Sequence, residues 1–460
     1  MSPRVFLKSF TNSLIRINKS KNNENSNMSR HQNEVKETQV KIQSLEVTGL
    51  KNTRKGVLNK IVQPVIGATT LTEAFIKTQQ AVNILKQLDL VKDVEVEIGK
   101  SDISIADSSD KVPISVKFTC EESRRALVRT GAEVSSGDFN CNVSGKLKNV
   151  FGGGEYFEIE NIAYKENGNS VQTNFSTPIG INPRFRFTLS GVQNWSNNRI
   201  YSGYKEILRD FSANISKSEF FHKNTFAYNL SWRNICDLSE NASPSIRNEA
   251  GHSLKSSISY IYERDTWNAM DPKKSYYKLR LFSEFAGLGG DASYIKNQVD
   301  LKSELNIYKQ WSLMGVLRIG TLFPLNNSTI HISDRFFLGG PASIRGVQFR
   351  GMGPFDRKDS LGGDFYGLAS LSLLTPLPFI KTDKINGQIW LNAGNLKMWE
   401  KMDIFKPSLS IFDKPTAISG FGITYMISNF KVELNYCLPI SARTSDKLRK
   451  GFQIGVGIVF

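Results

Sequence analysis

The sequence predicts an all-β transmembrane barrel of about sixteen antiparallel strands, preceded by one small α+β domain. Three observations lead to this fold class. Apolar and polar residues alternate along segments of about 10–12 residues over most of the chain, long enough to cross a bilayer when tilted. Helical patterns are confined to the first quarter of the 460 residues. A long segment near residue 340, rich in Phe, Gly and Arg, has the period of neither a helix nor a strand.

Composition excludes several classes of protein. No run of about 18 uncharged apolar residues occurs, so we do not expect a transmembrane helix. The net charge is +16, but Lys and Arg are spread along the chain, so we expect no nucleic-acid partner. The cysteines Cys120, Cys141, Cys236 and Cys437 fit neither a zinc spacing nor a disulfide framework. The histidines are equally scattered, and we expect no metal and no cofactor.

Residues 1–40 are predicted to be a disordered basic and polar tail. Met1–Ser20 contains four cations, no acid and no continuous apolar core, so a secretory signal is not expected. Asn22–Glu37 is polar enough to favour disorder. The first twenty residues also resemble a mitochondrial presequence, because they are basic, contain serine and lack acids, and this alternative stays open.

Residues 41–122 predict a small α+β domain with the element order β-α-α-β-β. A short strand precedes two amphipathic helices, for which Thr53 and Thr72 are the expected N-caps. Two strands follow, and the first alternates through Val94, Val96 and Ile98. A module of about 80 residues is near the lower size at which one hydrophobic core suffices.

Residues 123–460 predict the barrel. In one of its segments Phe430, Val432 and Leu434 alternate with Lys431 and Glu433. A soluble β-sandwich would alternate too, but its strands would average about 5–6 residues. Lipid cannot satisfy an open strand edge, so the strands must close into a ring. The candidate strands lie near 124–135, 138–147, 154–163, 171–178, 184–192, 207–217, 224–233, 252–263, 274–286, 296–309, 311–320, 363–374, 385–394, 417–427, 429–438 and 450–460.

A gap of about forty residues, 321–362, interrupts the strand series, and a loop of this length is usually functional or disordered. Its core, DRFFLGGPASIRGVQFRGMGP at 334–354, is rich in Phe, Gly and Arg. This composition argues against a solvated linker. We predict a loop that packs inside the barrel and places a cation there. The candidate residues of this inward loop are Gly339, Gly340, Ile344, Arg345, Gly346, Val347 and Phe349.

Several of these motifs resemble a known family. FFLGGPASIRG, followed by GMGP, LGGDFYG and LLTPLPF, looks like the sixth loop and following strand of BamA-type outer-membrane assembly factors. The order of elements in 41–122 and the phrase LKQLDLVKDVEVEI resemble a POTRA domain. With one such domain and no secretory signal, residues 41–460 resemble the core barrel of the mitochondrial sorting and assembly machinery.

The resemblance implies a function, a location and partners. It implies an insertase that folds β-barrel precursors and inserts them into the mitochondrial outer membrane, with the POTRA-like domain facing the intermembrane space. The implied partners are unfolded precursors carrying a β-signal, metaxin-type and other receptor subunits, and the lipid bilayer. It implies neither a cofactor nor enzymatic activity.

The loop departs from the family motif, which is Val or Ile followed by Arg-Gly-Phe. Here residues 344–347 read IRGV, so the aromatic is replaced, and Phe349 is the candidate to take over its packing. In the bacterial relatives the loop arginine meets carboxylates on the next two strands.

The positions that match those carboxylates here are Ser372 and Asn392, and both are neutral. The resemblance therefore leaves two kinds of partner for Arg345, which are backbone carbonyls or another acid such as Asp364. Either suits a guanidinium, whose five donors form a fixed fork.

The last strand, near 450–460, must pair with the first, near 124–135, to close the ring. Phe452, Ile454, Val456, Ile458 and Phe460 are expected on one face, and Gln453, Gly455 and Gly457 on the other. The spacing of Gln453, Gly455, Ile458 and Phe460 resembles the β-signal of mitochondrial barrel precursors.

Glycine offers no side chain to pack, so Gly455 and Gly457 are expected to weaken this seam. We predict a lateral gate at which a client strand is added to the first strand. The candidate gate residues on the first strand are Leu127, Val128 and Gly131, and a cysteine pair at 128 and 456 is expected to lock it.

Three other functions compete with this one. A protein-translocating channel of the same superfamily, passing unfolded chains through its lumen, shares every feature and is the alternative. A passive porin explains neither residues 41–122 nor the loop motif. For an enzyme, Gly152–Gly154 lacks the following Gly-Lys-Ser/Thr of a P-loop, and GHSLK at 251–255 lacks the closing glycine of a nucleophile elbow. No catalytic residue is expected.

Overall fold

The computed structural model describes most of the chain, in two compact units. The first unit contains the N-terminal domain together with residues 146–157 and 175–186, and the second contains the rest of the barrel. The predicted tail 1–40 lies almost wholly outside the described residues. The described residues are 38–100, 111–135, 138–164, 168–267, 275–308, 311–326, 328–340, 343–377, 384–399, 414–427 and 430–458.

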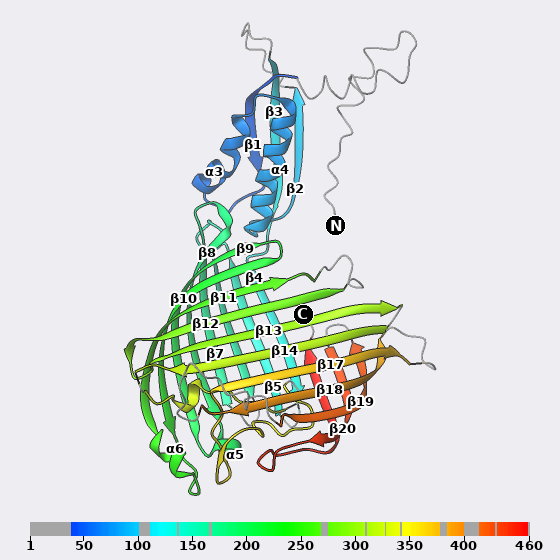
Figure 1. Ribbon diagram of the computed structural model, residues 1–460. Coiled ribbons are helices and arrows are strands. Elements are labelled where there is room, and N and C mark those ends of the chain that lie inside the picture. The colour runs from blue at the N-terminus through cyan, green and yellow to red at the C-terminus, as the bar shows by residue number, and fades with distance from the viewer. Residues whose placement is uncertain are drawn as a thin grey trace. The chain divides into compact units, whose positions relative to one another are not determined.

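The N-terminal domain is a three-stranded sheet with two helices (Figure 1). Its strands have the order β1-β3-β2, with β1 parallel and β2 antiparallel to β3. The predicted α+β fold and its order of elements are confirmed. The elements are β1 (Val40–Thr48), α3 (Lys55–Ile66), α4 (Leu71–Gln87), β2 (Val91–Lys100) and β3 (Val112–Glu122). Among the described residues, no helix is both long and apolar enough to cross a membrane.

The helix starts differ from those predicted. Helix α4 is capped by Thr70, whose Oγ1 accepts from the backbone N–H of Glu73 at 3.2 Å, so the prediction of Thr72 is wrong. The spacing Thr-x-x-Glu identifies Thr70 as the cap. Glu73, three residues later, accepts in return from the backbone N–H of Thr69, just before the helix. Helix α3 starts after Arg54 without a side-chain cap, while Thr53 Oγ1 accepts from Asn149 at 3.2 Å.

The core of this domain lies between the helices and the sheet. Val65 of α3, Leu85 of α4 and Phe118 of β3 are fully buried. Burial of each such side chain stabilises the fold by about 1.5–3 kcal/mol. The helical period that puts Val65 and Leu85 on the inner faces is the one that the sequence predicts.

The remaining strands form one closed barrel of sixteen strands, which confirms the predicted fold class (Figure 1). The strands neighbour one another in chain order, and β21 meets β4 to close the ring. The barrel strands are β4 (Ala126–Ser135), β5 (Asp138–Lys148), β6 (Tyr156–Tyr164), β7 (Gly168–Ile179), β8 (Asn182–Asn197), β9 (Lys205–Glu219), β10 (His222–Cys236), β11 (Gly251–Asp265), β12 (Tyr276–Gly290), β13 (Tyr294–Tyr308), β14 (Trp311–Pro324), β17 (Phe365–Pro376), β18 (Ile385–Lys397), β19 (Thr416–Ile427), β20 (Phe430–Ser441) and β21 (Gly451–Ile458).

The two faces of the barrel wall differ in the way the alternation predicts. On β18, Ile389 is 62% exposed whereas its neighbour Trp390 is 2% exposed. On β10, Phe226 is exposed whereas Ser231 and Arg233 are buried. The exposed apolar set forms the outer face, which suits lipid, and the alternate set faces the lumen.

The seam between β21 and β4 contrasts with the neighbouring pairing. Strands β20 and β21 pair continuously from Phe430 opposite Ile458 to Cys437 opposite Gly451. Within the described residues, β21 and β4 pair at Gly455 opposite Ser135. Continued in this antiparallel register, residue 456 lies opposite residue 134. A cysteine pair at 128 and 456 would therefore not meet, and that sequence-based expectation is wrong.

Candidate functional site

The inward loop connects β14 to β17 and spans residues 325–364. It begins four residues later than predicted, because β14 continues to Pro324. The loop contains a short 3₁₀ helix, η1 (Ile332–Asp334), and a two-stranded hairpin of β15 (Phe355–Asp356) and β16 (Asp359–Ser360).

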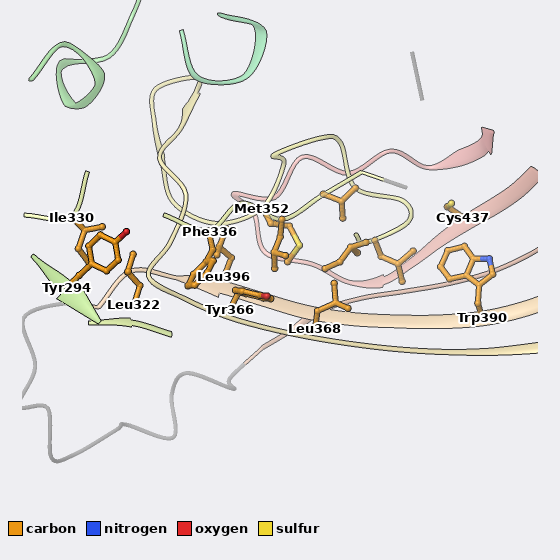
Figure 2. Close-up of a cluster of buried hydrophobic side chains, with 14 of the residues drawn as sticks. Tyr294, Leu322, Ile330, Phe336, Met352, Tyr366, Leu368, Trp390, Leu396 and Cys437 are labelled. Carbon is orange, nitrogen blue, oxygen red and sulfur yellow. The ribbon is translucent and has the colours of Figure 1, made fainter. Parts of the chain in front are cut away.

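The loop packs against the lumen face of β17 to β20. Ile344 and Val347 are fully buried, in one cluster with the lumen-facing Leu368, Trp390 and Ile418. Figure 2 shows side chains of this cluster in a row along the wall, from Tyr294 at one end to Trp390 and Cys437 at the other. Since the exposed apolar residues of the same strands face outward, the loop lies inside the ring.

Glycines on the wall make room for the loop. A Cβ at Gly394 of β18 would lie 2.3 Å from Ile344 Cδ1. A Cβ at Gly320 of β14 would lie 2.1 Å from the Tyr366 ring of β17, which packs on Phe336 of the loop, and 2.9 Å from Phe336 itself. These distances are far below van der Waals contact, so larger residues there would displace the loop.

Arg345 forms an ion pair with Glu433 on β20. Its Nη2 and Nε donate to Glu433 Oε2 at 2.9 and 3.3 Å, and the side chains are 12% and 16% exposed. The guanidinium carbon also lies 5.5 Å from the ring centre of Trp390. The loop cation is thus balanced by a carboxylate, and a guanidinium held by two donors to one oxygen is fixed in orientation.

The structure corrects the expected acidic partner of Arg345. Asp364 accepts instead from the backbone N–H of Trp399 at 3.3 Å, and burial raises the pKa of its carboxyl group. Asp364 lies just before β17, whereas Glu433 faces the lumen at the level of Gly455, which is opposite it on β21. The alternation of β20 already placed Glu433 on the polar face, but sequence alone did not connect it to Arg345.

The two neutral positions matched to family carboxylates differ in role. The Asn392 side-chain oxygen accepts from the backbone N–H of Arg345 at 3.1 Å, in the amide orientation in which its nitrogen donates to Ser370 Oγ and to the Leu391 carbonyl. Ser372 is buried at 1% exposure, and its hydroxyl has no hydrogen-bond partner among the described residues. Asn392 therefore holds the loop through the main chain of Arg345, and the guanidinium extends to β20.

Gly346 requires a glycine for two reasons. Its φ is +79°, and a Cβ there would lie 2.9 Å from Ile418 Cγ2 and 3.1 Å from Cys437 Cβ. L-residues are disfavoured at such angles, and the space is already filled. The close approach allows the Gly346 N–H to donate to Gln453 Oε1 of β21 at 3.1 Å.

Val347 fills the position of the family aromatic itself, because it is completely buried. Phe349 is 50% exposed and packs on Tyr201, with ring centres 5.0 Å apart. The expectation that Phe349 replaces the motif aromatic in the core is therefore wrong. Val347 belongs to the same buried cluster as Ile344 and Trp390.

Gly339 and Gly340 let the loop fold back on itself. Their φ angles are +125° and +93°. A Cβ at Gly339 would lie 2.1 Å from the carbonyl oxygen of Gln348, and the Gly340 N–H donates to the Val347 carbonyl at 3.1 Å. These contacts connect the FFLGG segment to the segment that follows Arg345.

A second anchor of the loop lies at Asp334, which sequence reasoning did not single out. Arg233 of β10 donates to Asp334 Oδ2 at 2.5 Å, and both side chains are less than 5% exposed. Tyr294 of β13 donates to Asp334 Oδ1 at 2.8 Å, and Lys296 donates to its carbonyl at 2.7 Å. Burial opposes ionisation of Asp334, but Arg233 and Lys255 outweigh it and lower the pKa of this carboxyl group.

The two anchors lie on opposite sides of the barrel. Glu433 is on β20, which is eight strands round the sixteen-strand ring from the β10 of Arg233. The loop partners, Asp334 and Arg345, are eleven positions apart, a segment that can reach at most about 40 Å. The loop therefore crosses the lumen between two opposite parts of the barrel wall. We call this crossing part of the loop, which is held at Asp334 and Arg345, the strut.

A third set of contacts joins the loop to two strand connections. Asp359 of β16 accepts from the Ser243 N–H at 2.7 Å, and Asp356 accepts from Ser245 Oγ at 2.7 Å. Ser202 Oγ donates to the Ser360 carbonyl at 2.9 Å. These serines belong to or border the short helices α5 (Arg199–Ser202) and α6 (Pro244–Asn248), in the β8–β9 and β10–β11 connections.

The predicted gate residues lie on the first and last barrel strands. On β4, Val128 is 72% exposed, Leu127 is half-buried, and Gly131 lies against Asn142. Ser135 of β4 faces Gly455 of β21, and in an antiparallel pair the earlier residues of β4 face the later residues of β21. Leu127 and Val128 would therefore face positions beyond Ile458, the last residue of β21.

On β21, the expected alternation holds where side chains are described. Gln453 is 3% exposed, whereas Phe452 and Ile454 are 70% and 59% exposed. Gly455, Gly457 and Ile458 lie in the strand, and Phe460 lies outside the described residues.

Comparisons with known proteins agree with this architecture. The family model of the Omp85 superfamily domain matches residues 149–460. A SAM50-like protein of Schizosaccharomyces pombe is 33% identical, over 92% of this chain and 91% of that protein. The human sorting and assembly machinery component 50 homolog is 30% identical, over 92% of this chain and 90% of that protein.

Among solved structures, BamA from Haemophilus ducreyi lacking POTRA domains 1–3 has a TM-score of 0.74 at 14% identity. The match covers 91% of this chain and 85% of that one. CdiB from Acinetobacter baumannii has a TM-score of 0.52 at 13% identity, covering 91% and 73%. At these identities the structural matches concern the fold alone.

Proposed function

This chain belongs to the Omp85 superfamily, and from that premise we propose that it folds β-barrel precursors and inserts them into the mitochondrial outer membrane. The precursors would leave through a lateral gate between β4 and β21. The observation that carries the proposal is the contrast at the seam, where the described pairing of β21 is continuous with β20 and confined to Gly455–Ser135 with β4.

The chemistry required of such a gate is strand exchange. Separation of β4 and β21 exposes two rows of backbone donors and acceptors, and an extended client segment can pair with them by strand addition. The free energy then comes from client strand pairing and burial in lipid. No covalent bond changes, so we propose no catalytic residue and no nucleotide.

The alternative function, a channel for unfolded chains, fits the inward loop less well. The loop crosses the lumen between Arg233 on β10 and Glu433 on β20 and is fixed by an ion pair at each end, fully buried at Arg233 and partly buried at Glu433. An unfolded chain in the lumen would have to displace at least one of these anchors, and displacement of the buried one leaves a buried charge unpaired at a cost of about 3–5 kcal/mol. Lateral release leaves both anchors in place.

Location and partners are proposed from the relatives. The human homolog is named as a component of a sorting and assembly machinery, so we propose that this chain works in such a complex with metaxin-type and other receptor subunits. The POTRA-like domain would face the intermembrane space, where precursors with a β-signal would reach it.

Depletion followed by import tests the proposed function. We expect that a radiolabelled porin precursor still reaches depleted mitochondria but fails to become resistant to alkaline extraction. An outer-membrane protein with a single helical anchor should insert normally and serves as the control. Integration of porin at the wild-type rate in depleted mitochondria would overturn the proposal.

A seam lock distinguishes the gate from the channel. Ser135→Cys with Gly455→Cys places cysteines at the described pair of the seam. Oxidation should stop client release, and reduction should restore it, with each single-cysteine variant as the control. A channel that passes chains through its lumen would continue to work with the seam locked.

A further inference from the structure

The inward loop pairs with the turn that joins the last two strands. The Gln348 N–H donates to the Lys447 carbonyl at 3.0 Å, and the Arg449 N–H donates to the Gly346 carbonyl at 2.8 Å. Val347 lies opposite Leu448 as an antiparallel bridge between these bonds. The loop thus adds a short ladder to the β20–β21 hairpin, on the lumen side.

Side chains extend this attachment into the strands. Gln453 of β21 accepts from the Gly346 N–H at 3.1 Å, and Glu433 of β20 accepts from Arg345 at 2.9 Å. Asn435 of β20 donates to the same Glu433 oxygen at 3.2 Å. Gln453 is 3% exposed, so water cannot replace it as the acceptor for Gly346.

The attachment of the β20–β21 hairpin to the loop therefore exceeds the described attachment of β21 to β4. The hairpin meets the loop through two backbone hydrogen bonds of its turn, the buried acceptor Gln453 of β21 and the ion pair of Glu433 on β20. Within the described residues, β21 meets β4 at Gly455–Ser135. A ring under strain opens where the fewest contacts must break, which is between β21 and β4.

We propose that Gln453 and Glu433 are positioning residues that hold the β20–β21 hairpin on the inward loop as the fixed side of the gate, so that opening displaces β4. This inference rests on the proposed lateral gate and specifies which of its two sides moves. Since Asp334 ties the same loop to β10, the fixed side includes the strut and the wall from β10 to β21.

Two disulfide locks test which side moves. Val347→Cys with Leu448→Cys joins the loop to the hairpin at a non-hydrogen-bonded antiparallel pair, where Cα atoms are about 4.5 Å apart, within the range of a disulfide. We expect equal client insertion by the oxidised and reduced forms of this variant. Oxidation of the Ser135→Cys, Gly455→Cys pair should block insertion.

The outcomes of the locks separate the two proposals. If both locks block insertion, the loop must leave the hairpin, and the fixed-side inference is overturned while the lateral gate stands. If neither lock blocks insertion, the lateral gate itself is overturned. Single-cysteine variants control for pairing with the native cysteines, of which Cys437 is buried near Gly346.

Hydrogen exchange tests the positioning role without any client. Gln453→Leu keeps the size of the side chain but leaves the Gly346 N–H without its acceptor. We expect exchange of backbone amides in 346–349 and 447–455 to become at least about tenfold faster. Gln298→Leu, on the lumen face of β13, is the matched control and should leave these amides unchanged. Unchanged exchange in Gln453→Leu would overturn the inference whatever the locks show.

Glu433→Gln tests whether the negative charge of Glu433, and not only the size of its side chain, holds Arg345 of the loop. The amide can still accept from Arg345 but no longer neutralises it, so we expect faster exchange in 344–349, with a smaller change in β21 than for Gln453→Leu. If Glu433→Gln exchanges like wild type, Glu433 has no positioning role.

Discussion

Asp334→Asn tests the anchor that sequence reasoning missed. The substitution keeps the size of the side chain and an oxygen that can accept from Tyr294. It removes the charge that faces Arg233, whose side chain is 2% exposed. The Nε and Nη2 atoms of Arg233 have no hydrogen-bond partner among the described residues, so little remains to compensate the cation.

Removal of one partner from a buried ion pair costs about 3–5 kcal/mol, because the other charge stays buried. The exposed fractions of Arg233 and Asp334 justify this range without a discount for solvent screening. Asp300→Asn is the matched control. Asp300 also faces two lumen arginines, at 3.7 and 3.8 Å, but its side chain is 33% exposed, and the loss should be about 0–1 kcal/mol.

Urea unfolding of the protein in lipid vesicles measures the difference. With a slope of about 3 kcal/mol per M, Asp334→Asn should lower the unfolding midpoint by about 1–2 M. Adding Arg233→Met should recover part of the loss, because the buried cation closest to Asp334 is removed while Lys255 and Lys296 remain beside it. If Asp334→Asn loses no more stability than Asp300→Asn, the anchor contributes nothing, and the strut across the lumen is not stabilised at that end.

Three further predictions concern the loop and the N-terminal domain. Gly346→Ala should destabilise the barrel by about 2–5 kcal/mol, since a left-handed φ and the contact with Ile418 are both unfavourable for a Cβ; unfolding in urea measures it. Ile344→Ala should cost about 2–5 kcal/mol in the same assay, because the side chain is fully buried. Hydrogen bonding to Lys77 is the main cause that lowers the pKa of Glu73 to about 2, so its stabilisation of helix α4 is present above about pH 4.5 and is lost as the pH falls through 2. Glu73→Gln should remove that part of the pH dependence, measured by amide exchange in α4.

The number and placement of the barrel strands could be predicted because the signal is local. Each strand exposes alternate residues to lipid and lumen, so its period is written in about ten consecutive positions. The α+β order of the N-terminal domain is equally local. Cap positions do not follow from the helical period, since Thr70 and Thr72 are both good cap residues and the choice depends on Glu73.

The candidate site was predictable in part. The glycines of the loop and the buried Ile344 follow from composition and from the family motif. The partners of Arg345 and Asp334 did not follow, because Glu433 is 88 positions from Arg345 and Arg233 is 101 positions from Asp334. Phe349 was expected in the core, but a loop without a period gives no rule for which aromatic faces inward.

The sequence by itself determined the period of every strand, and through it the ring and the face on which each side chain lies. Only the tertiary structure decided that the loop crosses the lumen from β10 to β20, and that the β20–β21 hairpin has more described contacts with this loop than β21 has with β4. The physical reason is that alternation fixes the direction of a side chain, whereas the partner it meets depends on ring closure and strand register, which bring distant residues within hydrogen-bonding distance.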